Sequence, residues 1–189
     1  VQVLDDLFFE FIKTANKLKP KVVISENVKG LIQGKAKGYV KQIFQKFNEA
    51  GYDTQLFLLN ASRMGVPQKR ERTFFISRRK DLNLPKIKLE FNEQTISIEH
   101  AIKNFIKEKG KDFRSSVNYK YYKKIKEGES FSKAHPNKSL FSLIKLDLKN
   151  PCPTVTATNA SSQLYLPCDM FGLSKNQINC IQTDRKSVV

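Results

Sequence analysis

The chain is poor in acidic residues and in long apolar runs, and it contains no tryptophan. Among its 189 residues 34 are basic and only 18 are acidic, so the formal net charge is +16. This imbalance favours a polyanionic partner, most simply a nucleic acid. A basic soluble protein without such a partner would show the same composition. Charge alone therefore determines neither the fold nor the chemistry.

Cysteine is also scarce. Cys152, Cys168 and Cys180 provide neither a disulfide framework nor the spacing of a metal site. We interpret Cys152 as a loop thiol and the other two as packing residues. No apolar run reaches the ~18 residues that span a bilayer, and the first residues lack the pattern of a signal peptide. These shortages favour a cytoplasmic protein that needs neither a metal nor a membrane.

The sequence patterns at both ends of the chain are cut off abruptly. Position 1 is not methionine, and the apolar pattern of a helix has already begun there. Residues 184–189 break the preceding pattern abruptly, and we interpret them as a sequencing artefact. We therefore expect an internal fragment of a longer protein.

The first 80 residues alternate between helical and strand patterns. Apolar residues recur at helical spacing over 4–18 and 39–49, and Gly51 provides a stop. Three short β-branched or aromatic runs predict strands, with a loop over 60–69 before the last: 21–25, 54–59 and 72–77. The strand–helix–strand order indicates an α/β, doubly wound sheet. We expect its first strand to be parallel and buried on both faces, and its last two strands to pair antiparallel.

The chain changes character after residue 80. A polar connector leads to a short predicted helix over 97–106, with Ser97 as its cap. Residues 103–150 hold 13 basic and 5 acidic residues among seven aromatic ones. We expect a second, smaller domain with a modest core here. Its lysines would bind phosphates, unless they form only a solvated charged face.

The last third of the chain contains two further elements. Residues 150–166 are rich in threonine and serine and prone to form strands. Residues 173–182 predict the start of a helix capped by Ser174, with Gln177 at the capping-box position.

Two polar motifs stand at the ends of predicted strands. Glu26 and Asn27 follow the first strand, and Arg70 and Arg72 lead into the third. A carboxyl group can contact N3 and the amine of a cytosine, and a guanidinium can reach O2. Together they would stabilise the charge that develops when a nucleophile adds to C6. Taken singly, each motif is better explained as a polar loop cap or a basic surface hairpin.

Taken together, in this order, the two motifs resemble a known family. Residues 26–28 (Glu-Asn-Val) and 68–72 (Gln-Lys-Arg-Glu-Arg) are similar to the Glu-Asn-Val and Gln-x-Arg-x-Arg motifs of the cytosine-C5 methyltransferases. Residues 153–157 (Pro-Thr-Val-Thr-Ala) resemble the stretch that closes the family's target recognition domain. Residues 173–182 resemble the start of the helix motif that follows, although the arginine expected near Phe171 is missing.

The resemblance implies a role for each motif residue. Glu26 would contact N3 of the cytosine, and Asn27 would brace the loop of the nucleophile. Arg72 would contact O2, while Arg70 would hold a phosphate or the mobile catalytic loop. Three further residues would bind the DNA substrate: Gln68, Thr154 and Thr156.

The resemblance also implies a domain organisation. The fold would be α/β, the C-terminal half of a doubly wound Rossmann-like methyltransferase sheet plus a small, irregular target recognition domain. We expect a partial catalytic domain over 1–85, target recognition over 90–170 and the start of a return to the catalytic domain over 171–183. The nucleophilic cysteine and the main motifs for S-adenosylmethionine would lie outside this chain. Its cofactor-binding residues are therefore unassigned, and the chain alone would be inactive.

The implied function is that of a DNA cytosine-C5 methyltransferase. It would transfer a methyl group from S-adenosylmethionine to a flipped cytosine in a specific duplex sequence. A bacterial or phage enzyme of a restriction–modification system would suit this function, as a cytoplasmic monomer beside a nuclease that cuts the same site. Two alternatives remain at this stage: a tRNA cytosine-C5 methyltransferase, and a DNA-binding module without catalysis.

Overall fold

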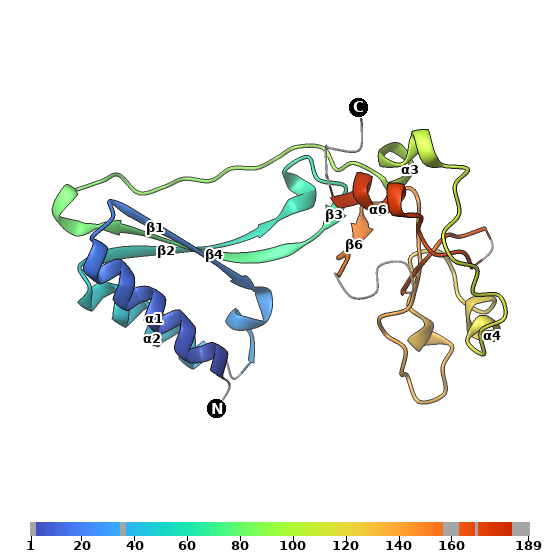
Figure 1. The fold of residues 1–189 in the computed structure, drawn as a ribbon, viewed down its shortest axis with the longest axis horizontal. Helices are drawn as coiled ribbons and strands as arrows, with labels where there is room; N and C mark the ends of the chain where they lie inside the picture. Colours follow the sequence, from blue (N-terminus) through green and yellow to red (C-terminus); the bar gives the residue numbers. More distant parts are fainter. Residues whose placement is uncertain (1–2, 35–36, 157–162, 169, 183–189) are drawn as a thin grey trace. The chain divides into compact units, whose positions relative to one another are not determined.

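The chain forms two compact units (Figure 1). Unit 1 comprises Val1–Asn60 and Glu71–Glu90, and unit 2 comprises Ala61–Arg70 and Phe91–Val189. The computed structural model describes four stretches of the chain: residues 3–34, 37–156, 163–168 and 170–182. No helix within these stretches is both long enough and apolar enough to cross a membrane.

Unit 1 is a three-stranded sheet covered on one face by two helices. The strands lie in the order β1 (Val22–Val28), β4 (Glu71–Arg79) and β2 (Tyr52–Asn60), with β4 antiparallel to both neighbours. Helices α1 (Val3–Leu18) and α2 (Lys37–Glu49) lie side by side along the covered face (Figure 1). The described residues up to 82 also include short 3₁₀ turns. These are η1 (Lys29–Ile32) and η4 (Lys80–Leu82) in unit 1, and η3 (Ala61–Arg63) in unit 2.

An aromatic core joins the helices of unit 1 to the sheet. Phe47 of α2 and Phe75 of β4 are fully buried, and the ring of Phe8 meets both of them edge-on. Buried Tyr52 completes the group by donating its hydroxyl hydrogen to the carbonyl oxygen of Pro20 over 2.9 Å. The core forms because the apolar stripes of both helices and alternate strand residues face the same layer.

The structure confirms both predicted helices, all three strands and the antiparallel pairing of the last two. The expectation of a parallel first strand buried on both faces is wrong. β1 alternates along its length, with Val23 buried and Ile24 60% exposed, and it pairs antiparallel with β4. The reason is that the two helices cover only one face. β1 also runs on to Val28, so Glu26 and Asn27 lie within the strand and not beyond its tip.

Two side chains of the sheet hold the connector that leaves unit 1. The amide of Gln55 makes two hydrogen bonds with the backbone of Ile87, donating over 3.0 Å and accepting over 2.8 Å. Arg78 donates to the carbonyl oxygen of Leu84 and is paired with Asp53. The connector is therefore fixed along the sheet although it has no strand partner of its own.

Unit 2 consists of short elements joined by long irregular segments. Two pairs of two-residue parallel strands are β3 (Gln68–Lys69) with β6 (Cys152–Pro153), and β5 (Ile144–Lys145) with β7 (Leu164–Tyr165). The remaining elements of this unit are α3 (Ile98–Ala101), η5 (Lys103–Phe105), α4 (Tyr119–Tyr122), η6 (Phe131–Lys133) and α6 (Lys175–Gln182).

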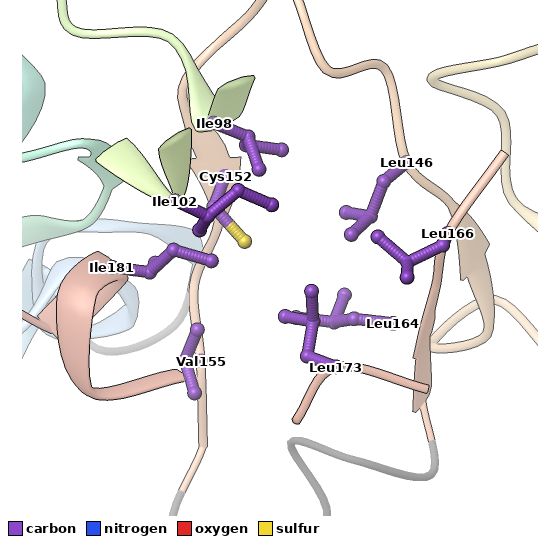
Figure 2. Close-up of a cluster of buried hydrophobic side chains, with 9 residues drawn as sticks. All are labelled: Ile98, Ile102, Leu146, Cys152, Val155, Leu164, Leu166, Leu173 and Ile181. Atoms are coloured by element: carbon purple, nitrogen blue, oxygen red, sulfur yellow. The ribbon is translucent and has the colours of Figure 1, made fainter. Parts of the chain in front are cut away.

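Two buried clusters hold unit 2 together. Figure 2 shows the first, in which Cys152 of β6 and isoleucines of α3 and α6 face a group of leucines that includes Leu164 of β7. The second is aromatic and centres on Tyr122, Phe131 and Tyr165. The core is larger than the modest one predicted, because single apolar residues from many short segments converge where no helical or strand period reveals them.

The predicted helix caps of unit 2 are confirmed. Ser97 accepts the backbone N–H of His100 at 3.2 Å, although the helix that it caps is shorter than expected. At the start of α6, Ser174 Oγ accepts from Gln177 N at 3.2 Å, and Gln177 Oε1 accepts from Ser174 N at 2.8 Å. Two predicted segments lie outside the described residues: 157–162 of the strand-prone stretch, and the tail over 184–189.

Candidate active site

Glu26 and Arg72 meet on the face of the unit 1 sheet that the helices leave open. In the register of β1 and β4, Arg72 lies opposite Val28 and Glu26 lies opposite Phe74, so the two side chains are diagonal neighbours on one face. Arg72 Nε donates to Glu26 Oε1 over 2.7 Å. The side chain of Glu26 is 47% exposed and that of Arg72 is 21% exposed. Both groups are thus accessible to a ligand.

A buried hydroxyl group and a second ion pair hold the ends of β1 and β4 in place around Glu26 and Arg72. Thr73 is fully buried, and its hydroxyl donates to the carbonyl oxygen of Asn27 over 3.0 Å. A second ion pair joins Lys29 to Glu71 at 2.7 Å. The sequence analysis did not identify these supporting residues. The position of Thr73 beside Arg72 in a predicted strand was the one available signal, because adjacent strand residues point to opposite faces.

The arrangement can recognise a flat, polar ring edge. A carboxylate accepts hydrogen bonds and a guanidinium donates them, so the pair offers both functions within one contact distance. The antiparallel ladder between β1 and β4 holds both side chains in register before any ligand arrives. This preorganisation is what a site requires if its charges are to act on a developing transition state.

Unit 2 brings Gln68 of β3 close to Thr154, which directly follows β6. Gln68 is buried, and its side-chain oxygen accepts the backbone N–H of Val155 at 3.4 Å. The hydroxyl of Thr154 donates to the carbonyl oxygen of Lys69 over 2.8 Å. Thr156 is exposed, just past this joint. Arg70 is half-buried, and its backbone N–H donates to the carbonyl oxygen of Gln68 over 3.0 Å.

A cavity of about 430 Å³ opens beside this joint in unit 2. Lys69, Asn150 and Thr154 contribute polar groups to its lining, together with Asp147. Hydrogen bonds from the backbone of Lys149 and the side chain of Asn150 lower the pKa of Asp147 below its ordinary value. The carboxylate therefore stays charged and holds this turn in place.

The aromatic residues of the basic stretch over 103–150 are mainly structural. Tyr122 and Phe131 are buried, and Phe113, Tyr119 and Tyr121 pack against them. Cations lie over several of these rings at 4.5–5.3 Å from the ring centres: Lys111, Lys120, Lys123 and Lys145. Lysine stems thus cover the aromatic core while their ammonium groups remain available to an anion.

Two of the three interpretations of the cysteines are wrong. Cys152 is fully buried in β6, and this burial raises the pKa of its thiol to about 12. Cys168 is exposed, while Cys180 packs against the aliphatic core as expected. The proline on each side of Cys152 indicated a loop, but a two-residue strand fits between them.

Comparison with known proteins gives a consistent result. The sequence model of the C-5 cytosine-specific DNA methylases matches residues 3–183. The type II methyltransferase M.FnuDI of Fusobacterium nucleatum is 45% identical over 78 residues, which are 41% of this chain and 23% of that protein. M.DdeI of Desulfomicrobium norvegicum is 33% identical over 141 residues, 67% of this chain and 34% of that protein. The chain thus spans about a quarter to a third of these relatives.

A solved structure supports the fold. A protein described as a candidate DNA modification methyltransferase, encoded within an E. coli prophage, superposes with a TM-score of 0.63. The superposition covers 94% of this chain and 63% of that one, at 17% sequence identity. At this identity the likeness concerns the fold alone, and it extends over both units.

Proposed function

Since the chain belongs to the family of C-5 cytosine-specific DNA methylases, we propose that it supplies the cytosine-binding and target-recognition parts of an enzyme that methylates C5 of cytosine in duplex DNA. The methyl donor is S-adenosylmethionine. The observation that carries the proposal is the ion pair of Glu26 and Arg72 on the open face of the sheet. The partial catalytic domain extends over 1–85, the target recognition domain over 90–170 and the return to the catalytic domain over 171–183.

The chemistry of cytosine explains why this pair suits the reaction. C5 becomes reactive only when a nucleophile adds to C6, which moves negative charge toward N3 and O2. The Arg72 guanidinium stabilises that charge at O2, while Glu26 contacts N3 and the exocyclic amine. The two groups already lie within 2.7 Å of each other, so one ring edge can contact both. The base must first leave the duplex.

Two neighbours of the pair have supporting roles in this proposal. Asn27 braces the loop that carries the nucleophile, and its own backbone is held by Thr73. Arg70 holds a DNA phosphate or the mobile catalytic loop. Cys152 does not suit the role of nucleophile, because burial raises the pKa of its thiol and thiolates are the reactive form. As the family resemblance implies, the nucleophilic cysteine would belong to a part of the protein outside this chain.

The charged cavity of unit 1 does not fit the methyl donor. S-adenosylmethionine carries a sulfonium cation and a ribose diol, which require carboxylate acceptors. The unit 1 cavity of about 340 Å³ is lined by Arg78, Arg79 and Lys80, and its Asp53 is already paired with Arg78. A cationic lining repels a sulfonium. We therefore assign donor binding to other parts of the protein and derive no step from it.

Duplex DNA is the partner that the charge of unit 2 favours. Lysines over the aromatic core would contact phosphates, and Thr156 is exposed in the same unit. The relatives named above are type II methyltransferases. By analogy the protein would act as a cytoplasmic monomer in a restriction–modification system, beside a nuclease that cuts the same site.

Methyl transfer by the complete polypeptide that carries this chain tests the proposal. Labelled S-adenosylmethionine would be offered with unmethylated phage DNA and, separately, with tRNA. We expect label in DNA cytosine, and a loss of at least about 100-fold with Glu26→Ala. Glu49→Ala, which removes an exposed carboxylate on α2, should leave the rate unchanged.

The other outcomes distinguish the alternatives. Label in tRNA alone would make the protein a tRNA methyltransferase. Sequence-specific DNA binding with no transfer to either substrate would leave a DNA-binding module. Full activity in Glu26→Ala would remove the ion pair from the mechanism.

A further inference from the structure

Residues 68–72 belong to both units at once. Gln68, Lys69 and Arg70 are part of unit 2, whereas Glu71 and Arg72 are part of unit 1. The chain leaves the sheet after Asn60 and returns to it at Glu71. A segment that carries a candidate catalytic arginine is therefore anchored at its other end among the recognition residues.

The anchor in unit 2 consists of hydrogen bonds between two short segments, around β3 and β6. β3 and β6 run parallel, and Cys152 N donates to the carbonyl oxygen of Pro67 over 2.9 Å. The side chains of Gln68 and Thr154 add the bonds to Val155 and Lys69 described above. Arg70 N closes the segment by donating to the carbonyl oxygen of Gln68.

β6, the strand to which β3 is bonded, packs into the core of unit 2. Cys152 and Val155 both point into the aliphatic cluster of Figure 2, where Cys152 is fully buried and Val155 is 3% exposed. Movement of β6 would disturb that packing, which makes it a fixed support. Gln68 and Lys69 are held against this support.

The anchor in unit 1 is the ion pair of Arg72 with Glu26, beside that of Glu71 with Lys29. Arg72 is three positions after Lys69, and a fully extended chain spans at most about 11 Å over that distance. So short a segment absorbs little displacement. Gln68 and Lys69 therefore lie within four positions of Arg72 on one short stretch of chain.

We propose that Gln68 and Thr154 are positioning residues, which hold β3 on β6 and so steady the short segment that leads from β3 to Arg72 during methyl transfer. The inference rests on the proposed function. It differs from a direct DNA contact, which is the role that the family resemblance implies for both residues. The side chain of Gln68 is buried and already bonded, so it is poorly available to DNA.

Two substitutions of Thr154 in the complete polypeptide separate the two roles. Thr154→Val removes the hydroxyl at almost constant volume, and Thr154→Ser keeps it. We expect Thr154→Val to lower the single-turnover rate of methyl transfer about five- to tenfold, the effect of one lost hydrogen bond. The Kd for cognate DNA should stay within about twofold, and Thr154→Ser should restore most of the rate.

The contrary results are equally definite. A raised Kd with an unchanged single-turnover rate would show that Thr154 contacts DNA directly and would overturn the inference. A rate equal to the original for Thr154→Val would overturn it as well. Absence of methylation by the original protein would instead contradict the proposed function. Thermal unfolding of both variants shows whether Thr154→Val is still folded. If it is not, the single-turnover rate and the Kd for cognate DNA of Gln68→Leu decide between the two roles.

Discussion

Unit 1 and unit 2 reach stability by different means. In unit 1, strands of seven and nine residues form an uninterrupted ladder, and two helices press a layer of phenylalanine rings onto it. In unit 2 the strands are two residues long. Its two buried clusters are supplemented by polar side chains that bond the backbone of distant segments. The ion pair of Glu26 and Arg72 lies on the regular unit, and the basic stretch over 103–150 lies on the irregular one. Rigid elements suit precise chemistry, whereas irregular segments can vary in sequence without disturbing it.

The largest expected effect concerns the aromatic core of unit 1. Phe75→Ala removes a fully buried ring that meets Phe8 and Phe44. It should lower the free energy of unfolding by about 3–5 kcal/mol, whereas Leu18→Ala, at a 76% exposed position, should change it by less than about 0.5 kcal/mol. Urea unfolding measures both. Equal effects of the two substitutions would show that this layer does not hold the unit together.

In unit 2 the polar side chain of Gln177 should contribute strongly to stability, as the ring of Phe75 does in unit 1. Gln177 is fully buried and bonds the backbone of Ser174, Phe105 and Glu108. Gln177→Leu leaves these groups without partners and should destabilise unit 2 by about 2–3 kcal/mol. Hydrogen exchange of unit 2 peptides reports the change, with exposed Lys175→Ala as the control. Unchanged exchange would mean that apolar packing alone holds this unit.

The connector offers a smaller and more local test. Gln55→Leu removes both hydrogen bonds to Ile87 and should lower stability by about 1–2 kcal/mol. Exchange of the Ile87 amide should rise, while peptides from α2 keep their protection. Gln45→Leu, on the exposed side of α2, serves as the control. If the Ile87 amide of the Gln55→Leu variant stays as protected from hydrogen exchange as in the original protein, the proposed attachment of the connector is contradicted.

The smallest expected effect is a difference in acid sensitivity. Hydrogen bonds lower the pKa of Glu108, through Ser174 and Asn176, and of Asp112, through Arg114. A lowered folded-state pKa contributes stability above the ordinary carboxyl pKa, and that contribution disappears as the pH falls through the folded value. Exchange of unit 2 peptides should therefore accelerate below about pH 4. Asp112→Asn should flatten that dependence, and a dependence unchanged by the substitution would contradict this origin.

The contrast between the units also explains what the sequence could predict. Both helices and all three strands of unit 1 follow from periodicity, because long elements repeat their burial pattern several times. The burial of β1 was misjudged since the run Val-Val-Ile is equally apolar on both faces, and only the arrangement of α1 and α2 decides which face is covered. In unit 2 the caps at Ser97 and Ser174 were predictable because capping depends on neighbouring residues. The joint between β3 and β6 was not, since it unites residues more than 80 positions apart.

The candidate site divides in the same way. Glu26 and Arg72 were identified from their motifs, and the structure places them in contact. Thr73 and the pair of Lys29 with Glu71 were missed, because their importance depends on the register between β1 and β4. Local sequence identifies the groups that react, but the groups that position them become visible only in the folded chain.

A double-substitution cycle at Glu26 and Arg72 tests the central claim most directly. Single-turnover methyl transfer would be measured in the complete polypeptide for Glu26→Ala, Arg72→Ala and both together. If the two residues stabilise one transition state, each single change should cost about 100-fold or more, and the double change little beyond the larger single loss. Losses that multiply, or a rate that neither change affects, would show that the pair is a structural ion pair and not the cytosine site.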